Sequence, residues 1–106
     1  MGFAKERKKL EKLSEKTTSL QHYDGESLAV ITDIFEQYSH TVRILKNKNH
    51  EAFNDLYLNE LQLVKQCKRS LKLAEEEEGR EANFITYKEV LLDALTKTIQ
   101  ASMDIV

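Results

Sequence analysis

The sequence of 106 residues contains no proline and only three glycines. Proline ends or kinks a helix, and a glycine inside a helix costs about 1 kcal/mol relative to alanine. Apolar residues at helical spacing can therefore continue almost from one end of the chain to the other. The sequence predicts an all-α fold, and the positions of its few helix breaks decide the architecture.

Three polar segments interrupt the helical pattern. Residues 22–25 end in Asp-Gly, a pair typical of turns, and residues 47–49 contain two Asn residues that suit helix caps. We expect a third break near 79–83, where Gly79 ends one helix and Asn83 caps the next. A helix that continues through Gly79 is the alternative. The sequence thus predicts one domain over residues 1–106, with helices at about 3–21, 26–46, 50–78 and 83–104.

Two architectures satisfy this pattern. If all three breaks are sharp, the chain forms an antiparallel four-helix bundle with short loops. If only the break at 47–49 is sharp, it forms a long antiparallel helical hairpin with arms of similar length. The narrow apolar stripes of the first and third segments favour the hairpin, which would complete its core against a partner. The choice depends on whether Gly25 and Gly79 break their helices.

The composition limits the possible classes of function. The net charge is −2, so the chain as a whole does not attract nucleic acid. Residues 5–16 hold six Lys or Arg against three Glu, and residues 75–81 hold five Glu against one Arg; both patterns are usual on solvated helix faces. No stretch reaches the ~18 apolar residues of a membrane span, and the basic N-terminus lacks the apolar segment of a signal peptide. We expect a cytoplasmic protein, or one exported with a partner by a signal-peptide-independent route.

Few residues suit catalysis or cofactor binding. Cys67 is the only cysteine and has no base near it in the sequence, which indicates a passive helix residue. None of the three histidines lies three residues after a Glu, the spacing that di-metal helical bundles use. The glycines are too isolated for a phosphate-binding loop. We therefore expect no enzyme activity, no metal and no cofactor.

The apolar stripes are the remaining source of binding energy. Aromatic residues at helical spacing usually belong to a core, but aromatic residues are also enriched at the centres of protein interfaces. We predict that the partner is a helical protein or a second copy of the chain, and we expect no nucleic-acid partner. The side chains predicted to meet that partner are Leu28, Ile31, Phe35, Tyr38, Phe53, Tyr57, Leu91 and Leu95.

These features favour a helical protein–protein interaction module in which charges fix the register and exclude wrong partners. The alternative is a self-contained bundle that acts as an inhibitor or immunity protein through the acidic residues 75–81. A third hypothesis is a small DNA-associated regulator that uses the basic face of residues 5–16 and binds duplex with a steep salt dependence.

The length, the two long arms, the polar turn at 47–49 and the charged, aromatic-containing residues 75–93 together form a whole-chain pattern. This pattern resembles the small helical-hairpin proteins of Gram-positive type VII secretion, which include WXG-type proteins and the accessory partners of LXG toxins. The chain has no Trp, and no Tyr is followed four residues later by Asp or Glu. The resemblance therefore implies an adaptor or targeting chaperone for the helical domain of a secreted toxin, and it carries over no functional residue.

Overall fold

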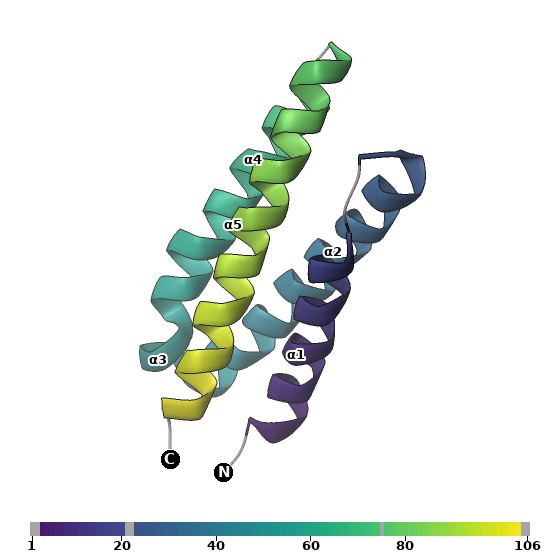
Figure 1. Ribbon diagram of the computed structural model, residues 1–106. Helices are drawn as coiled ribbons and strands as arrows, with labels where there is room; N and C mark the ends of the chain where they lie inside the picture. Colours follow the sequence, from purple (N-terminus) through teal and green to yellow (C-terminus); the bar gives the residue numbers. More distant parts are fainter. Residues whose placement is uncertain (1–2, 21–22, 75, 105–106) are drawn as a thin grey trace.

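The computed structural model describes residues 3–20, 23–74 and 76–104. These residues form four helical rods, and neighbouring rods run antiparallel (Figure 1). This confirms the all-α prediction. The first, second and fourth rods are single helices, whereas the third consists of two α-helical pieces joined by a π-helical turn. The elements in chain order are α1 (Ala4–Ser19), α2 (Gly25–Lys48), α3 (His50–Asp55), η1 (Leu56–Glu60), α4 (Leu61–Leu73) and α5 (Glu77–Asp104).

Side-chain caps define the starts of α2 and α3. The Asp24 carboxylate accepts a hydrogen bond from the backbone N–H of Ser27 at 2.7 Å, so α2 begins at Gly25. The Asn49 side chain accepts from the N–H of Ala52 at 3.2 Å and caps α3 in the same way. Each cap pairs one of the backbone donors that the first turn of a helix leaves unpaired. Both of these connections reverse the chain direction.

The third break lies earlier than the sequence pattern suggested. α4 ends at Leu73 and α5 begins at Glu77, so Gly79 and Asn83 both lie within α5 and the expected break at 79–83 is corrected. Gly79 does not have a positive φ, and the Asn83 side chain donates to the Gly79 carbonyl at 2.7 Å inside the helix. Acidic residues suit the N-terminal end of a helix because they complement its dipole. The run of Glu therefore favours a helix start before Gly79.

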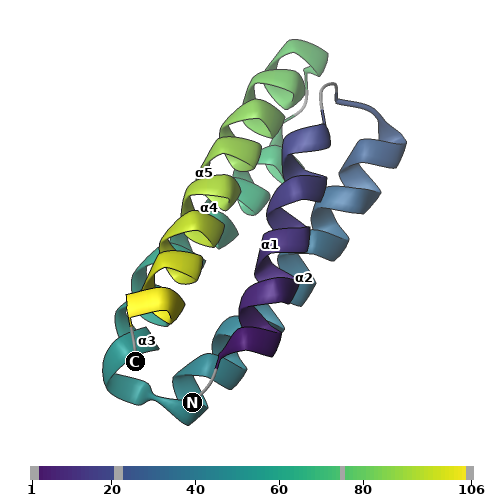
Figure 2. The same cartoon turned by 60° about the horizontal axis from the view of Figure 1, so that its bottom comes forward.

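One hydrophobic core lies between the four rods, and the two ends of the chain lie at the same end of the bundle (Figure 2). α1 and α2 are separate antiparallel helices, and so are α4 and α5, so the chain forms a closed bundle rather than an open hairpin (Figure 1). α5 packs between α1 and α4. The fully or almost fully buried hydrophobic side chains include Leu10, Leu13, Ile31, Ile34, Tyr38, Val42, Leu45, Phe53, Leu61, Val64, Phe84, Tyr87, Leu91 and Leu95.

The π turn η1 keeps the third rod in register with this core. Phe53 and Leu61 are both fully buried, although they are eight residues apart. In a regular α-helix, eight residues turn about 80° more than two full turns, which would set the two side chains on opposite edges of a core-facing stripe. A π turn holds one extra residue and absorbs this difference. Both sides of η1 therefore face the same core.

Candidate functional site

Six of the eight side chains predicted to meet a partner lie in the chain's own core. They are Ile31, Phe35, Tyr38, Phe53, Leu91 and Leu95, each at most 6% exposed. Side chains at this depth offer no area to a partner in the closed bundle. They were predicted to fill seams with a partner, but they fill seams between helices of the same chain. Leu28 and Tyr57 remain partly exposed, and the Lys46 ammonium lies 4.1 Å from the centre of the Tyr57 ring.

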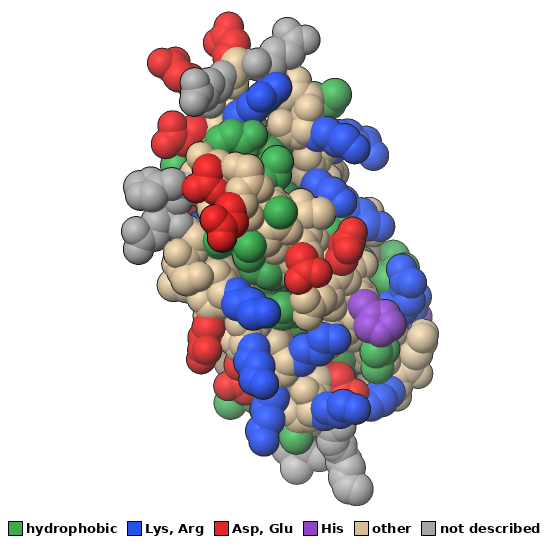
Figure 3. All heavy atoms as spheres, turned by 90° about the vertical axis from the view of Figure 1, so that its right-hand side faces the viewer, with side chains coloured by type: hydrophobic (Ala, Val, Ile, Leu, Met, Phe, Trp, Pro, Cys, Tyr) green, Lys and Arg blue, Asp and Glu red, His purple; other side chains and the backbone are tan. Residues whose placement is uncertain are grey.

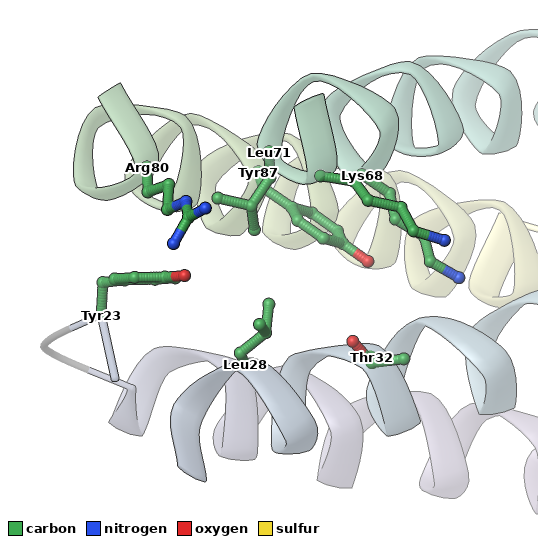
Figure 4. A pocket seen from close by; sticks show the side chains of 8 residues that line it. Tyr23, Leu28, Thr32, Lys68, Leu71, Arg80 and Tyr87 are labelled. Carbon is green, nitrogen blue, oxygen red and sulfur yellow. The ribbon is translucent and has the colours of Figure 1, made fainter. Parts of the chain in front are cut away.

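A pocket of about 450 Å³ lies between α2, α4 and α5, at the end of the bundle where α1 connects to α2 and α4 to α5 (Figure 4). Its walls combine aliphatic and aromatic surface with cationic and hydroxyl groups. This combination is typical of ligand pockets, in which an apolar lining holds a small number of oriented polar groups. The lining residues are Tyr23, Leu28, Thr32, Lys68, Leu71, Lys72, Arg80 and Tyr87.

Three cations give the pocket its electrostatic character. Lys68 and Lys72 are one turn apart on α4, and the Lys68 ammonium lies 5.0 Å from the centre of the Phe35 ring. Arg80 Nε donates to the carbonyl of Ala74 at 2.9 Å, which holds the guanidinium beside the α4–α5 connection. Within the described part of the chain, no salt bridge involves these three cations. A concave surface with several positive charges attracts anions.

Tyr87 belongs to the pocket wall. It is fully buried, and its hydroxyl has no hydrogen-bond partner among the described residues. Burial, with smaller contributions from Cys67 and Glu36, raises the pKa of Tyr87, so the hydroxyl keeps its proton at neutral pH. Figure 4 shows the hydroxyl directed to the part of the pocket that Lys68 and Thr32 line. The site therefore contains an unused hydrogen-bond donor.

Tyr38 is equally buried but has a partner. Its hydroxyl lies 3.2 Å from the Thr98 hydroxyl oxygen, which itself donates to the Ala94 carbonyl at 2.8 Å. A threonine hydroxyl has one proton, so Tyr38 is the donor and Thr98 the acceptor in this pair. Burial raises the pKa of Tyr38 to about 12. The two tyrosines thus form a natural comparison between a paired and an unpaired buried hydroxyl.

A second surface, which we call the α5 flank, consists of Ile85, Leu92, Ile99 and Met103. Successive members are seven, seven and four residues apart, so they lie along one side of the helix. Ile85 is 48% and Met103 55% exposed, and the other two are half-buried. Lys88 shares this side and donates to the carbonyl of Leu20 at the end of α1, which places the flank alongside α1.

The charged surface contains both signs. Figure 3 shows Lys and Arg side chains on the same face as acidic and hydrophobic side chains. Two ion pairs join different helices: Lys48 to Glu6 at 2.5 Å, and Lys97 to Glu60 at 3.4 Å. Among the described residues, no group of three His, Cys, Asp or Glu side chains is arranged to hold a metal ion. No helix within the described ranges has an apolar stretch long enough to cross a membrane.

Comparisons with protein-family models, with curated proteins and with solved structures find no match for this chain. The function is therefore inferred from two surfaces of the molecule, the pocket and the α5 flank. The flank residues were not among the side chains predicted to meet a partner, because their row runs beside the core stripe of the same helix. The pocket had no signal in the sequence, because its residues come from four separate segments.

Proposed function

We propose that the chain is a helical protein–protein interaction module that binds an amphipathic helix of a partner protein along the α5 flank. The observation that carries this proposal is the row of partly exposed apolar side chains on one long helix, with Ile85 and Met103 about half exposed. Apolar residues at this spacing form the seams between paired helices. Covering a half-exposed aliphatic side chain contributes about 1 kcal/mol, so several together support a specific contact.

The charges beside the α5 flank favour a particular type of partner helix. Glu81 and Glu89 lie four residues before and after Ile85, and both are exposed. A partner helix with Lys or Arg next to its apolar stripe would meet these carboxylates. Such rim charges contribute mainly to the choice of partner and to the rate of association. We therefore propose a partner helix that is apolar on one side and basic at its edge.

The sequence pattern that resembles accessory proteins of type VII secretion suggests a specific form of this proposal, although the chain folds as a closed bundle and not as the open hairpin of that pattern. In that form the partner is the helical targeting domain of a secreted toxin, and the chain acts as its adaptor or targeting chaperone. The α5 flank would cover an apolar stripe of the toxin domain that is otherwise exposed to water. This role needs no catalytic group, in agreement with the expectation of a protein that is not an enzyme.

The experiment is co-expression of the tagged chain with the product of the neighbouring gene, followed by calorimetric titration of the purified proteins. Ile85→Glu and Met103→Glu should each weaken binding roughly tenfold or more, because they place a charge in the apolar seam. Leu73→Glu is the matched control, since Leu73 is 72% exposed but lies on α4. Equal weakening by the control, or absence of any complex, would contradict the proposal.

The closed core favours a second candidate, a self-sufficient bundle that acts as an inhibitor or immunity protein. Glu76, Glu78 and Glu81 are exposed near the start of α5 and would face a basic target, while Glu75 and the side chain of Glu77 lie outside the described part of the structure. Reversing Glu76 and Glu78 to Lys would then abolish inhibition without effect on the α5 flank contact. A melting temperature independent of protein concentration would agree with this candidate.

A further inference from the structure

We propose that the pocket between α2, α4 and α5 binds a small amphipathic anion, a molecule with a carboxylate or phosphate head group on an apolar body. This inference is independent of the α5 flank, which lies along α1. The pocket volume of about 450 Å³ lies within the range of roughly 300–1,000 Å³ that is usual for small-molecule sites. Its residues divide into an apolar part and a cationic part.

The apolar part accounts for the body of the ligand. Leu28 of α2 and Leu71 of α4 both line the cavity, and Figure 4 shows the two side chains directed towards each other across it. Tyr87 also belongs to the lining, but it is fully buried behind these side chains and a ligand reaches it only when they move. A hydrocarbon chain or a ring placed here would remove apolar surface of protein and ligand from water. A purely polar anion such as inorganic phosphate gains none of this burial.

The cationic part accounts for the head group. Lys68 and Lys72 approach from α4, and Arg80 approaches from the start of α5. The bond from Arg80 Nε to the Ala74 carbonyl uses one guanidinium donor and leaves the other nitrogens to meet an acceptor. Carboxylate and phosphate oxygens are the acceptors that a guanidinium and an ammonium bind best. Three positive charges around one cavity also exclude cationic ligands.

The Tyr87 hydroxyl accounts for a deeper contact. It is a buried donor without a partner among the described residues, and such a group destabilises the folded state. The side chains that cover it must move aside when a ligand enters, and an oxygen acceptor of the ligand would then pair with it. Binding would therefore satisfy a donor that the described residues leave without a partner.

The probes for the test are decanoate and decyl phosphate, which share an apolar chain and differ in head group. Decanol has the same chain without the charge. By calorimetric titration we expect at least one of the two anions to bind with one-to-one stoichiometry and decanol to bind about tenfold more weakly. Comparison of the two anions identifies the head group. Binding should also weaken as salt is added, because the head-group contact is electrostatic.

Two double variants separate the pocket from the overall charge. Lys68→Met with Lys72→Met should weaken binding of the anion about tenfold, whereas Lys9→Met with Lys16→Met changes the net charge equally on the exposed surface of α1 and should leave it within about twofold. Circular dichroism checks that each variant is folded. Equal weakening by both pairs, equal binding of decanol, or no binding of either anion would overturn the proposal.

Tyr87→Phe tests the deeper contact. Loss of the hydroxyl should weaken binding of the preferred anion by about tenfold or more, the size expected for one hydrogen bond to a charged acceptor. Unchanged affinity would remove the hydroxyl from the site. The variant keeps the ring, so its apolar contacts in the pocket wall are retained.

Discussion

Replacement of Tyr87 by Phe should make the protein more stable, which is the opposite of the usual result for a buried tyrosine. The hydroxyl is buried and has no hydrogen-bond partner among the described residues. A buried polar group without a partner costs about 1–3 kcal/mol. Phe keeps the ring that packs in the core and removes this cost. We expect a gain near the lower limit, about 1 kcal/mol, because the ring lies beside a pocket that solvent can reach.

Tyr38→Phe is the matched control because Tyr38 is equally buried and differs in its hydrogen bond. Loss of the donor to Thr98 at 3.2 Å should cost about 1 kcal/mol in the free energy of unfolding. For a domain of this size, 1 kcal/mol corresponds to a change of about 4–8 °C in melting temperature. The two variants should therefore move the melting temperature in opposite directions.

Thermal and denaturant unfolding, followed by circular dichroism, measure both changes. The denaturant slope should stay the same in the two variants, since neither changes the surface exposed on unfolding. If Tyr87→Phe lowers the stability as much as Tyr38→Phe does, the Tyr87 hydroxyl has a partner in solution, such as an ordered water in the pocket. That result would refute the reasoning from the unpaired donor.

Three further predictions concern ionisation and helix structure. Folding raises the pKa of Tyr38 from 10.0 to about 12. The contribution of Tyr38 to stability is therefore fully present below pH 10 and is lost as the pH rises towards 12. Tyr38→Phe should flatten this part of a curve of stability against pH. The hydrogen bond from Lys48 lowers the pKa of Glu6 below 4.5. The contribution of ionised Glu6 to stability is therefore present above pH 4.5 and is lost in acid. In urea unfolding, Glu6→Gln should cost about 0.5–1 kcal/mol at pH 7 and little at pH 3. Gly79→Ala should raise the free energy of unfolding by about 0.5–1 kcal/mol, because alanine favours a helix more than glycine does. The new Cβ would lie 3.9 Å from the Ala74 Cβ, an ordinary contact. No gain in stability would contradict the placement of Gly79 inside α5.

Local signals in the sequence were sufficient for part of the fold. The absence of proline predicted long helices, and Asn49 marked a break because a side-chain cap acts within three residues of its own position. The third break was misplaced because two local signals competed there. Gly79 suits a helix end, but the preceding Glu residues suit a helix start, and the second preference agrees with the structure. The π turn had no signal in the sequence, because the spacing of Phe53 and Leu61 also fits a regular helix.

The candidate site was not predictable from local patterns. Tyr23, Lys68 and Tyr87 lie far apart in the sequence, and each alone is an ordinary residue of an amphipathic helix or a turn. The pocket exists because residues of α2, α4 and α5 face one cavity at the end of the bundle. The unpaired state of the Tyr87 hydroxyl likewise depends on which side chains of other helices surround it.

By itself, the sequence determined that the chain is helical and that it reverses near residues 47–49, because helix formation and capping depend on neighbours a few residues apart. Only the tertiary structure decided that Ile31, Phe35 and Leu91 fill seams within one chain, and that Ile85 and Met103 stay on the surface. Periodicity shows that a helix has an apolar side but not what covers it. Apolar side chains have the same spacing in a seam within one chain as in a seam between two chains. The packing of the chain's own helices into a closed bundle therefore decides which kind of seam these side chains form.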